Sequence, residues 1–233
     1  MNRLDRIRKA EAESHTAAYE NLTLYAPGSW LSKPVRALEV LLERYENRQG
    51  LRVLDLGSGV GRNAIACAQR LSDCVVECVD ILPIAVEKLM ENADRLGVSG
   101  KIRGVVAPVD GFSVPKSGYD MILAASVLEH LDSKISAERK LREIVGGIRS
   151  GGAVLIVMNT GVTECAVKSG APLDPQFEVI LPPDEARNLL ADAFRGWEVL
   201  WDKCIHYEYE VPRGDGMALI SAEVVTYVAR RPE

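Results

Sequence analysis

Between Leu51 and Met158 the sequence alternates short apolar runs with longer segments of helical character, and this alternation limits the possible folds more than any other feature. The five apolar runs have the length and the β-branched composition of strands. They are Leu51–Leu56, Cys74–Val79, Ile102–Ala107, Tyr119–Ala125 and Ala153–Met158. Near-continuously apolar strands separated by helices indicate a parallel sheet that is covered on both faces. The sequence therefore predicts a doubly wound α/β fold.

The segments that flank this region extend the prediction. Two helices, 4–20 and 35–47, should precede the first strand as a helical cap, and 159–181 should be an irregular excursion with Pro172 and Pro175. After a helix over 183–194, residues 197–210 and 217–229 should form an antiparallel hairpin. We expect a seven-stranded, mostly parallel sheet with this hairpin at its edge. The expected single domain divides into a cap (1–48), a ligand-binding core (51–158) and an insert with the hairpin (159–233).

The composition restricts the setting and the partners. The 233 residues carry a formal net charge of −5, which argues against broad nucleic-acid binding because that binding depends on Lys and Arg. No apolar stretch is long enough to span a membrane, and no apolar leader is expected. The five cysteines lack a CxxC spacing, and with three histidines they indicate reduced thiols and no metal site. We therefore expect a cytoplasmic protein, and the pattern favours no particular oligomeric state.

The glycine-rich turn after the first strand, Asp55-Leu56-Gly57-Ser58-Gly59-Val60-Gly61, predicts a ligand site. It reads G-x-G-x-G, whereas a dinucleotide fingerprint reads G-x-G-x-x-G and would place a glycine where Arg62 stands. A carboxylate at Asp55 is unfavourable beside a pyrophosphate and favourable beside an ammonium group. S-adenosylmethionine has an ammonium group and no phosphate, so it fits this turn better than a nicotinamide cofactor does. The alternative is a turn that binds no ligand.

Acidic side chains also follow the next two strands. Asp80 ends the second strand, where it can bind both ribose hydroxyls or cap the helix that begins at Pro83. Ile81 follows and can pack on an adenine face. Asp110-Gly111 comes after the third strand, where Asp110 can reach the adenine amino group or act as an ordinary turn residue.

These pieces together resemble the class I S-adenosylmethionine-dependent methyltransferases. The resemblance covers Leu51 to Met158, including the fourth-strand segment Tyr119–Leu131 and Gly151-Gly152. A weaker resemblance, through Gly61-Arg62-Asn63-Ala64 and the lead-in from Trp30, is to the tellurite-resistance branch, in which the segment before the first strand folds over the cofactor. The cofactor residues that result are Trp30, Asp55, Gly57, Ser58, Gly59, Gly61, Asn63, Asp80, Ile81, Asp110, Gly111 and Ala125.

The resemblance implies methyl transfer by in-line displacement, and His130 is the candidate general base at the end of the fourth strand. The other interpretation of His130 is a loop residue that shapes the pocket. Ala124-Ala125-Ser126-Val127 stands where base methyltransferases carry Asn/Asp-Pro-Pro-aromatic, so we expect a small-molecule acceptor. The alternatives are a non-catalytic module that binds S-adenosylmethionine and a nicotinamide-dependent oxidoreductase on a similar sheet.

Overall fold

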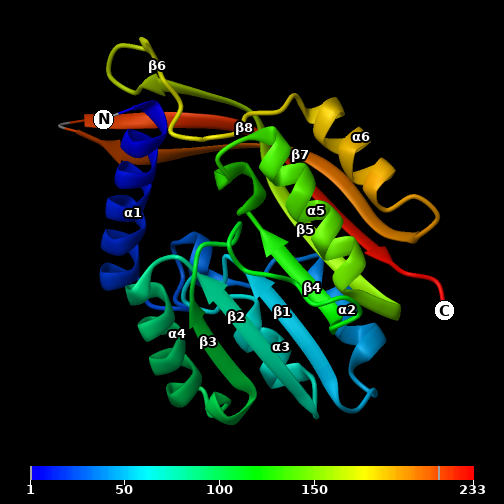
Figure 1. Cartoon of the computed structure of the whole chain (residues 1–233). Helices are drawn as coiled ribbons and strands as arrows, with labels where there is room; N and C mark the ends of the chain where they lie inside the picture. The colour runs from blue at the N-terminus through cyan, green and yellow to red at the C-terminus, as the bar shows by residue number, and fades with distance from the viewer. Residues whose placement is uncertain (1, 215) are drawn as a thin grey trace.

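The computed structural model describes residues 2–214 and 216–233 (Figure 1). The first half of the chain contains α1 (Arg3–Asn21), η1 (Trp30–Ser32), α2 (Leu38–Tyr45), β1 (Leu51–Leu56), α3 (Ala64–Arg70), β2 (Cys74–Asp80), α4 (Pro83–Arg95), η2 (Ser99–Lys101) and β3 (Ile102–Val106). The second half contains β4 (Tyr119–Ala125), η3 (Leu128–His130), α5 (Lys134–Gly147), β5 (Ile148–Ala166), β6 (Pro172–Leu173), α6 (Pro183–Ala193), β7 (Glu198–Arg213) and β8 (Gly216–Arg230).

The strands form one mixed sheet in the order β3-β2-β1-β4-β5-β8-β7, with β6 paired to β5 off this path. Strands β1 to β5 are parallel, β8 is antiparallel to β5, and β7 is antiparallel to β8. The predicted α/β fold with an antiparallel hairpin at the edge of the sheet is therefore confirmed. The reversed strand β8 lies one position in from the edge, which β7 forms.

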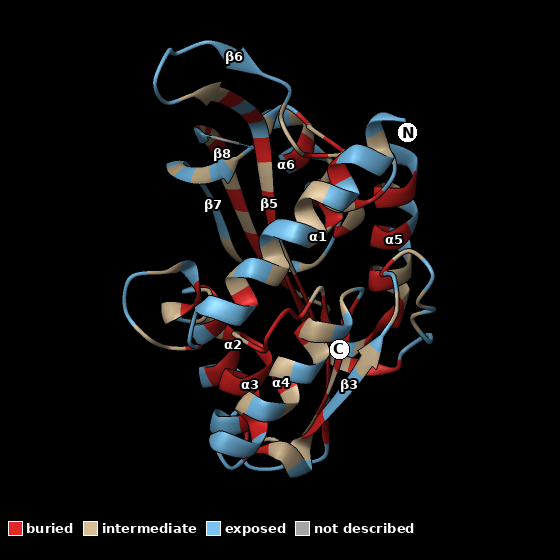
Figure 2. Ribbon diagram, turned by 90° about the vertical axis from the view of Figure 1, so that its left-hand side faces the viewer, coloured by how far each residue is buried: buried red, intermediate tan, exposed pale blue. Residues whose placement is uncertain are grey.

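Helices cover both faces of the sheet, as the apolar strands require. On one face α2, α3 and α4 bury Leu41, Ile65 and Leu89, and on the other α5 and α6 bury Leu141 and Leu190. Figure 2 shows the buried residues gathered in the strands and on the inner sides of the helices. Cys67, Cys74 and Cys78 belong to the first of these cores as free thiols, as expected. Among the described residues, no helix is long and apolar enough to cross a membrane.

The prediction for the fifth strand and the segment after it is wrong in extent. The strand expected at Ala153–Met158 runs from Ile148 to Ala166, so the first part of the expected irregular segment 159–181 is extended. The physical reason is the partner strand β8, which pairs with β5 from Ala153 to Ala166 with one register shift between Thr160 and Thr163. Beyond Met158 burial alternates along β5, because only one side of the strand is covered there.

Strands β5, β8 and β7 continue past the carboxyl ends of the other strands, and α1 runs beside this extension (Figure 1). A small separate core of Val162, Phe177, Ile220 and Ala222 stabilises it. Near one end of α1, Arg3 binds Asp174 through two hydrogen bonds of 3.2 Å. We call β5 from Asn159 onward, the tips of β7 and β8, and residues 167–181 the upper lobe.

Candidate functional site

The predicted ligand turn joins β1 to α3, and backbone hydrogen bonds hold it in a conformation that requires glycine. Gly57, Gly59 and Gly61 have φ angles of +68°, +52° and +93°, which only glycine adopts readily. The backbone N–H groups of Gly57 and Ser58 both donate to the carbonyl of Val79, at 2.8 and 3.0 Å. The turn is therefore fastened to the end of β2, where Asp80 follows.

Neighbouring side chains press on each glycine, so a methyl group at any of the three would collide. A Cβ at Gly57 would lie 2.7 Å from Val127, and one at Gly61 would lie 2.4 Å from Leu89. At Gly59 the contact is the hydroxyl oxygen of Tyr19, at 2.9 Å. The turn is thus enclosed by the end of β4, by α4 and by α1.

Asp55 and Ser58 present polar atoms that nothing in the described part of the chain satisfies. Oδ2 of Asp55 and Oγ of Ser58 are buried and have no hydrogen-bond partner. Burial raises the pKa of Asp55 to about 7, although the Arg62 guanidinium and a backbone hydrogen bond from Ala64 oppose the shift. A buried carboxylate in this state favours a cationic partner, because an ammonium group would supply both charge and donors.

Asp80 lies beside the turn, as predicted. Its Oδ2 accepts from the Gly59 N–H at 2.8 Å and its Oδ1 accepts from the Leu82 N–H at 2.9 Å. Burial raises the pKa of Asp80, and these backbone hydrogen bonds oppose the increase. Asp80 thus fixes the turn while its remaining lone pairs can accept from a ligand.

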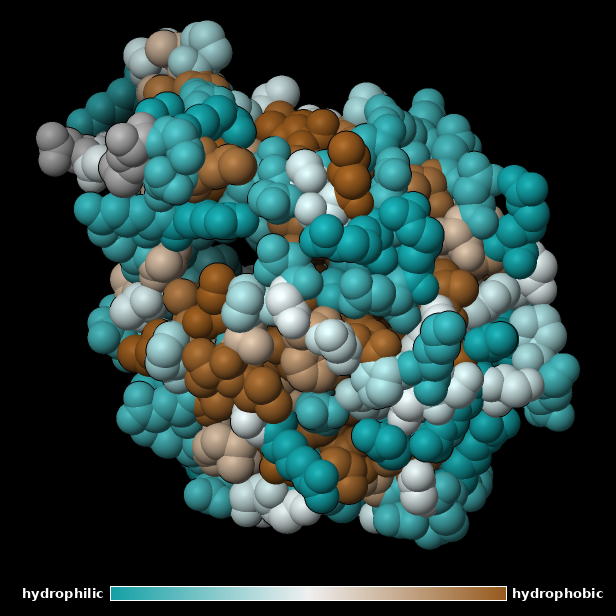
Figure 3. Space-filling view, in the orientation of Figure 1, coloured by the Kyte–Doolittle hydropathy of each residue, from teal (hydrophilic) through white to brown (hydrophobic). Residues whose placement is uncertain are grey.

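The other predicted core residues lie at the carboxyl ends of the parallel strands. Ile81 is 59% exposed after β2, half-buried Asp110 follows β3, and half-buried Ala125 ends β4. Gly111 closes a tight turn by donating to the carbonyl of Pro108 at 3.1 Å. Figure 3, drawn in the orientation of Figure 1, shows apolar side chains gathered on the left of the visible surface, toward α4 and β3. Their strand positions place these residues at the same edge of the sheet as the glycine turn.

The segment before β1 folds against the turn. Trp30 packs on the Arg62 guanidinium at 5.4 Å from the ring centroid, and Arg62 donates to the Trp30 carbonyl at 3.0 Å. The hydroxyl of Tyr25 donates to the Arg62 carbonyl at 2.8 Å. Asn63 has a related role, since its Oδ1 accepts from the Val35 N–H at 3.0 Å and so holds the incoming chain.

Sequence reasoning missed the contribution of α1. His15 and Tyr19 face the turn: their rings lie 5.6 Å apart, and each meets the Trp30 ring at 6.2 Å. The signal was present in the spacing of Ile7, Glu11, His15 and Tyr19, which repeats every four residues and places them on one helix face. Because three of these residues are polar or amphipathic, the pattern did not stand out as an apolar stripe.

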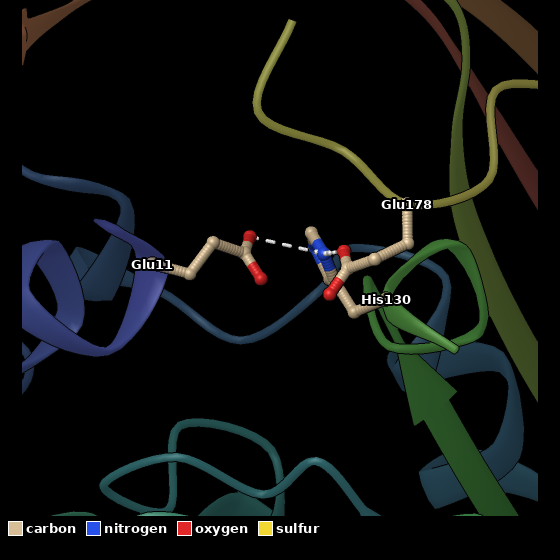
Figure 4. A group of neighbouring side chains, drawn as sticks. All are labelled: Glu11, His130 and Glu178. Carbon is tan, nitrogen blue, oxygen red and sulfur yellow. Dashed lines mark hydrogen bonds and ion pairs between the residues drawn. The ribbon is translucent and has the colours of Figure 1, made fainter. Parts of the chain in front are cut away.

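His130 lies between α1 and the upper lobe (Figure 4). Its Nδ1 is 3.0 Å from Oε1 of Glu11 and 3.1 Å from Oε2 of Glu178, and its ring stacks on Phe177 with 5.2 Å between centroids. Burial lowers the pKa of His130, but hydrogen bonds to both glutamates outweigh it and raise that pKa to about 10. In this arrangement the imidazole holds a proton at neutral pH and is a poor general base.

Glu129, next to His130, is a fully buried carboxylate at the base of the upper lobe. Its Oε1 accepts from the backbone N–H and from the side-chain amide of Asn159, at 2.8 and 2.7 Å, while Oε2 has no partner among the described residues. Its backbone carbonyl accepts from the Val179 N–H at 2.9 Å, which places Glu178 beside His130. Sequence reasoning did not identify Glu178.

The sheet order and the enclosed glycine turn with acidic side chains define an α/β protein that binds a nucleoside-like ligand at the carboxyl ends of its strands. Residues 53–152 match the family described as "Methyltransferase domain". Over these residues the chain is similar to the class I S-adenosylmethionine-dependent methyltransferases, the enzymes that use S-adenosylmethionine as cofactor.

Individual relatives and structures agree with this assignment. The chain is 30% identical over 109 residues to a protein-L-isoaspartate O-methyltransferase from Thermococcus onnurineus, an alignment that covers 47% of this chain and 49% of that protein. It therefore spans about half the length of this curated relative. TehB from Haemophilus influenzae has a TM-score of 0.61 with 21% identity, covering 83% of this chain and 61% of TehB. This second likeness shows the fold alone.

A second similar structure was solved with S-adenosylmethionine bound. It is the magnesium protoporphyrin IX methyltransferase of Synechocystis PCC 6803, with a TM-score of 0.58 and 16% identity, covering 99% of this chain and 98% of that one. In the present chain the unpartnered Oδ2 of Asp55 and Oγ of Ser58 fit an amino-acid ammonium group, and Asp80 fits a ribose. The residues at the turn therefore suit this cofactor.

Proposed function

We propose that this chain transfers a methyl group from S-adenosylmethionine to a small-molecule acceptor. The observation that carries the proposal is the buried, unpartnered Oδ2 of Asp55 beside a glycine turn that Asp80 holds in place. Such a carboxylate is costly without a cationic ligand, and S-adenosylmethionine is a cation without phosphate. The family match at residues 53–152 supports the same cofactor.

Each residue at the turn has a separate task. Asp55 and Ser58 would bind the ammonium group, Asp80 the ribose hydroxyls, and Asp110 the adenine amino group. The bound cofactor supplies a methyl group on a sulfonium, which is a good leaving group. The chain must then align the acceptor opposite the sulfur and exclude water, so that the new bond to the methyl carbon forms as the carbon–sulfur bond breaks.

The acceptor side supports a small molecule. We place the acceptor where α1, η3 and the upper lobe meet. Two contacts tie α1 to the upper lobe there: Arg3 binds Asp174, and Glu11 and Glu178 both contact His130. A site spanned by such contacts suits a compact acceptor better than the surface of a folded protein. The relative from Thermococcus onnurineus is named for a protein acceptor, so a protein acceptor is the outcome to be distinguished.

His130 was the catalytic candidate, and we propose that it positions neighbouring groups instead of removing a proton. The two glutamates that hold it support this role. We expect His130→Ala to lower turnover less than Asp80→Ala does, with the change mainly in KM for the acceptor. Complete loss of turnover with normal cofactor binding would instead make His130 the catalyst.

The decisive experiment measures binding and transfer separately. Calorimetry with S-adenosylmethionine and S-adenosylhomocysteine should give saturable binding, and NADH should give no difference spectrum. Radioactive methyl groups should then enter the dialysable fraction of a cell extract and not its proteins. Label in protein would support a macromolecular acceptor, and binding without label in either fraction would support a non-catalytic module. We also place the protein in the cytoplasm, which its free cysteines support.

A further inference from the structure

The side chains of Glu11, His130 and Glu178 converge from three separate parts of the chain on one point (Figure 4). Each offers one ligand atom, and the three atoms lie within 4.8 Å of one another. Glu11 comes from α1, His130 from η3 after β4, and Glu178 from the upper lobe. We propose that this triad is a binding site for a divalent transition-metal ion, with zinc the best fit.

The donor set matches the chemistry of zinc. Imidazole nitrogen and carboxylate oxygen are common zinc ligands, and three protein ligands with one open position is the arrangement of reactive zinc sites. In such a site the ion replaces the proton on Nδ1 of His130. Two carboxylates and a neutral imidazole carry two negative charges, which a divalent ion neutralises.

The distances already approach those of a coordination sphere. With zinc–ligand bonds of about 2.0 Å at tetrahedral angles, neighbouring ligand atoms lie ~3.3 Å apart. The two distances from Nδ1 of His130 are 3.0 Å to Glu11 and 3.1 Å to Glu178. The two carboxylate oxygens lie within 4.8 Å of each other, and both belong to flexible glutamate side chains that can adjust to an ion.

A second observation concerns Glu129, the residue next to His130 in the chain. Oε2 of Glu129 is buried without a hydrogen-bond partner, and the Glu129 carboxylate acts electrostatically on the His130 ring. Three carboxylates thus act on one imidazole. Arg8 contacts the other oxygen of Glu178, Oε1, at 3.8 Å, which leaves Oε2 facing His130. Stacking on Phe177 fixes the ring plane of His130, as a ligand histidine requires.

This inference does not depend on methyl transfer, and metal uptake tests it directly. We expect the full chain, freed of metal with a chelator and dialysed, to bind one zinc ion in calorimetry with zinc chloride. The variants Glu11→Gln, Glu178→Gln and His130→Ala should each bind at least about tenfold more weakly, because each removes a direct ligand. Zinc should raise the melting temperature of the wild type and not that of Glu178→Gln.

Two matched controls separate this site from adventitious binding. Glu13→Gln changes an exposed glutamate on the same helix, which pairs with Lys9 at 3.8 Å. His206→Ala removes the ring that lies 2.9 Å from Glu223 near the exposed Cys204, which is the competing surface site for zinc on the hairpin. Both controls should bind zinc like the wild type.

The proposal is overturned if the wild type takes up no zinc, or if Glu178→Gln binds zinc as well as the wild type does. Loss of uptake in His206→Ala would move the ion to the hairpin and equally refute the proposal. The circular dichroism spectrum and the urea denaturation midpoint of Glu178→Gln verify its folding. Because these measurements do not use S-adenosylmethionine, a failure of the proposed function leaves the zinc result interpretable, and the converse also holds.

Discussion

The hydroxyl of Tyr19 lies where a side chain at position 59 would stand, 2.9 Å from the position of a Cβ on Gly59. Helix α1 can therefore close on the turn only because residue 59 is a glycine. This relationship couples a helix near the start of the chain to the loop between β1 and α3. Substitution of Gly59 can therefore measure how much the contact between Tyr19 and the turn affects stability.

We predict that Gly59→Ala destabilises the protein by more than the cost of its backbone conformation. A positive φ at a residue with a Cβ costs about 1 kcal/mol, and the collision with Tyr19 adds to it. Gly97→Ala is the control, since Gly97 has a φ of +72° and nothing within 4 Å of its Cβ position. Urea denaturation measures both variants. Equal losses of unfolding free energy would show that α1 does not press on the turn.

We predict that Asp80→Ala weakens S-adenosylmethionine binding by about tenfold or more, because a hydrogen bond to a charged group is worth about 1.5–3 kcal/mol. The substitution also removes the acceptor for the Gly59 and Leu82 N–H groups, so the unfolding free energy should fall. Asp80→Asn keeps an acceptor oxygen and should recover part of the stability. Calorimetry showing unchanged affinity in folded Asp80→Ala would remove Asp80 from the cofactor site.

We predict that Asp55 makes the ligand-free protein less stable as pH rises toward neutrality. Its pKa is raised by burial from 3.8 to about 7, so between these values the folded state binds more protons than the unfolded state. The stability that this proton contributes is present at low pH and is lost as pH rises through about 7. Asp55→Asn should flatten that part of the stability profile.

The same carboxyl group should control cofactor affinity in the opposite direction. The ionised form of Asp55 attracts an ammonium group, so affinity for S-adenosylmethionine should increase from about pH 6 to about pH 8. Calorimetry at several pH values measures this, and Asp55→Asn should lose the dependence. An identical pH profile in both proteins would place the titrating group elsewhere.

We predict that Asn63→Ala loosens the chain before β1 and changes cofactor affinity only as a consequence. The side chain accepts from the Val35 N–H, so its loss leaves that donor unpaired at a cost of about 1–3 kcal/mol. Limited proteolysis should then cleave residues 22–35 faster than in the wild type. Faster cleavage that saturating S-adenosylmethionine reverses would support the anchoring role. A lower affinity without faster cleavage would favour direct contact with the cofactor.

The sequence predicted the core well because local patterns determine it. The bounds of β1 and β4 agree with the predicted strands, and the glycine turn lies where the spacing of its residues placed it. Apolar runs, turn glycines and the proline that begins α4 are local signals. They can be recognised without knowing which segments contact each other in the fold.

What the sequence did not predict depends on contacts between distant segments. The length of β5 depends on β8, which lies some sixty residues further along the chain and pairs with it as far as Ala166. The role of Glu178 depends on His130 and on a hydrogen bond from Val179 to Glu129. A single sequence contains these residues but does not show which of them pair. The cluster around His130 could therefore not be predicted from it.

The length of β5 has a kinetic consequence. One strand of 19 residues, β5, belongs to the sheet and continues into the upper lobe, so we expect these two parts to move together. We therefore expect α1 to be the part that moves when used cofactor leaves and new cofactor binds, because its side chains contact both Gly59 and His130. Detachment of that helix would set the rate of turnover. The rate should then follow the viscosity of the solvent and respond little to deuterium in the methyl group.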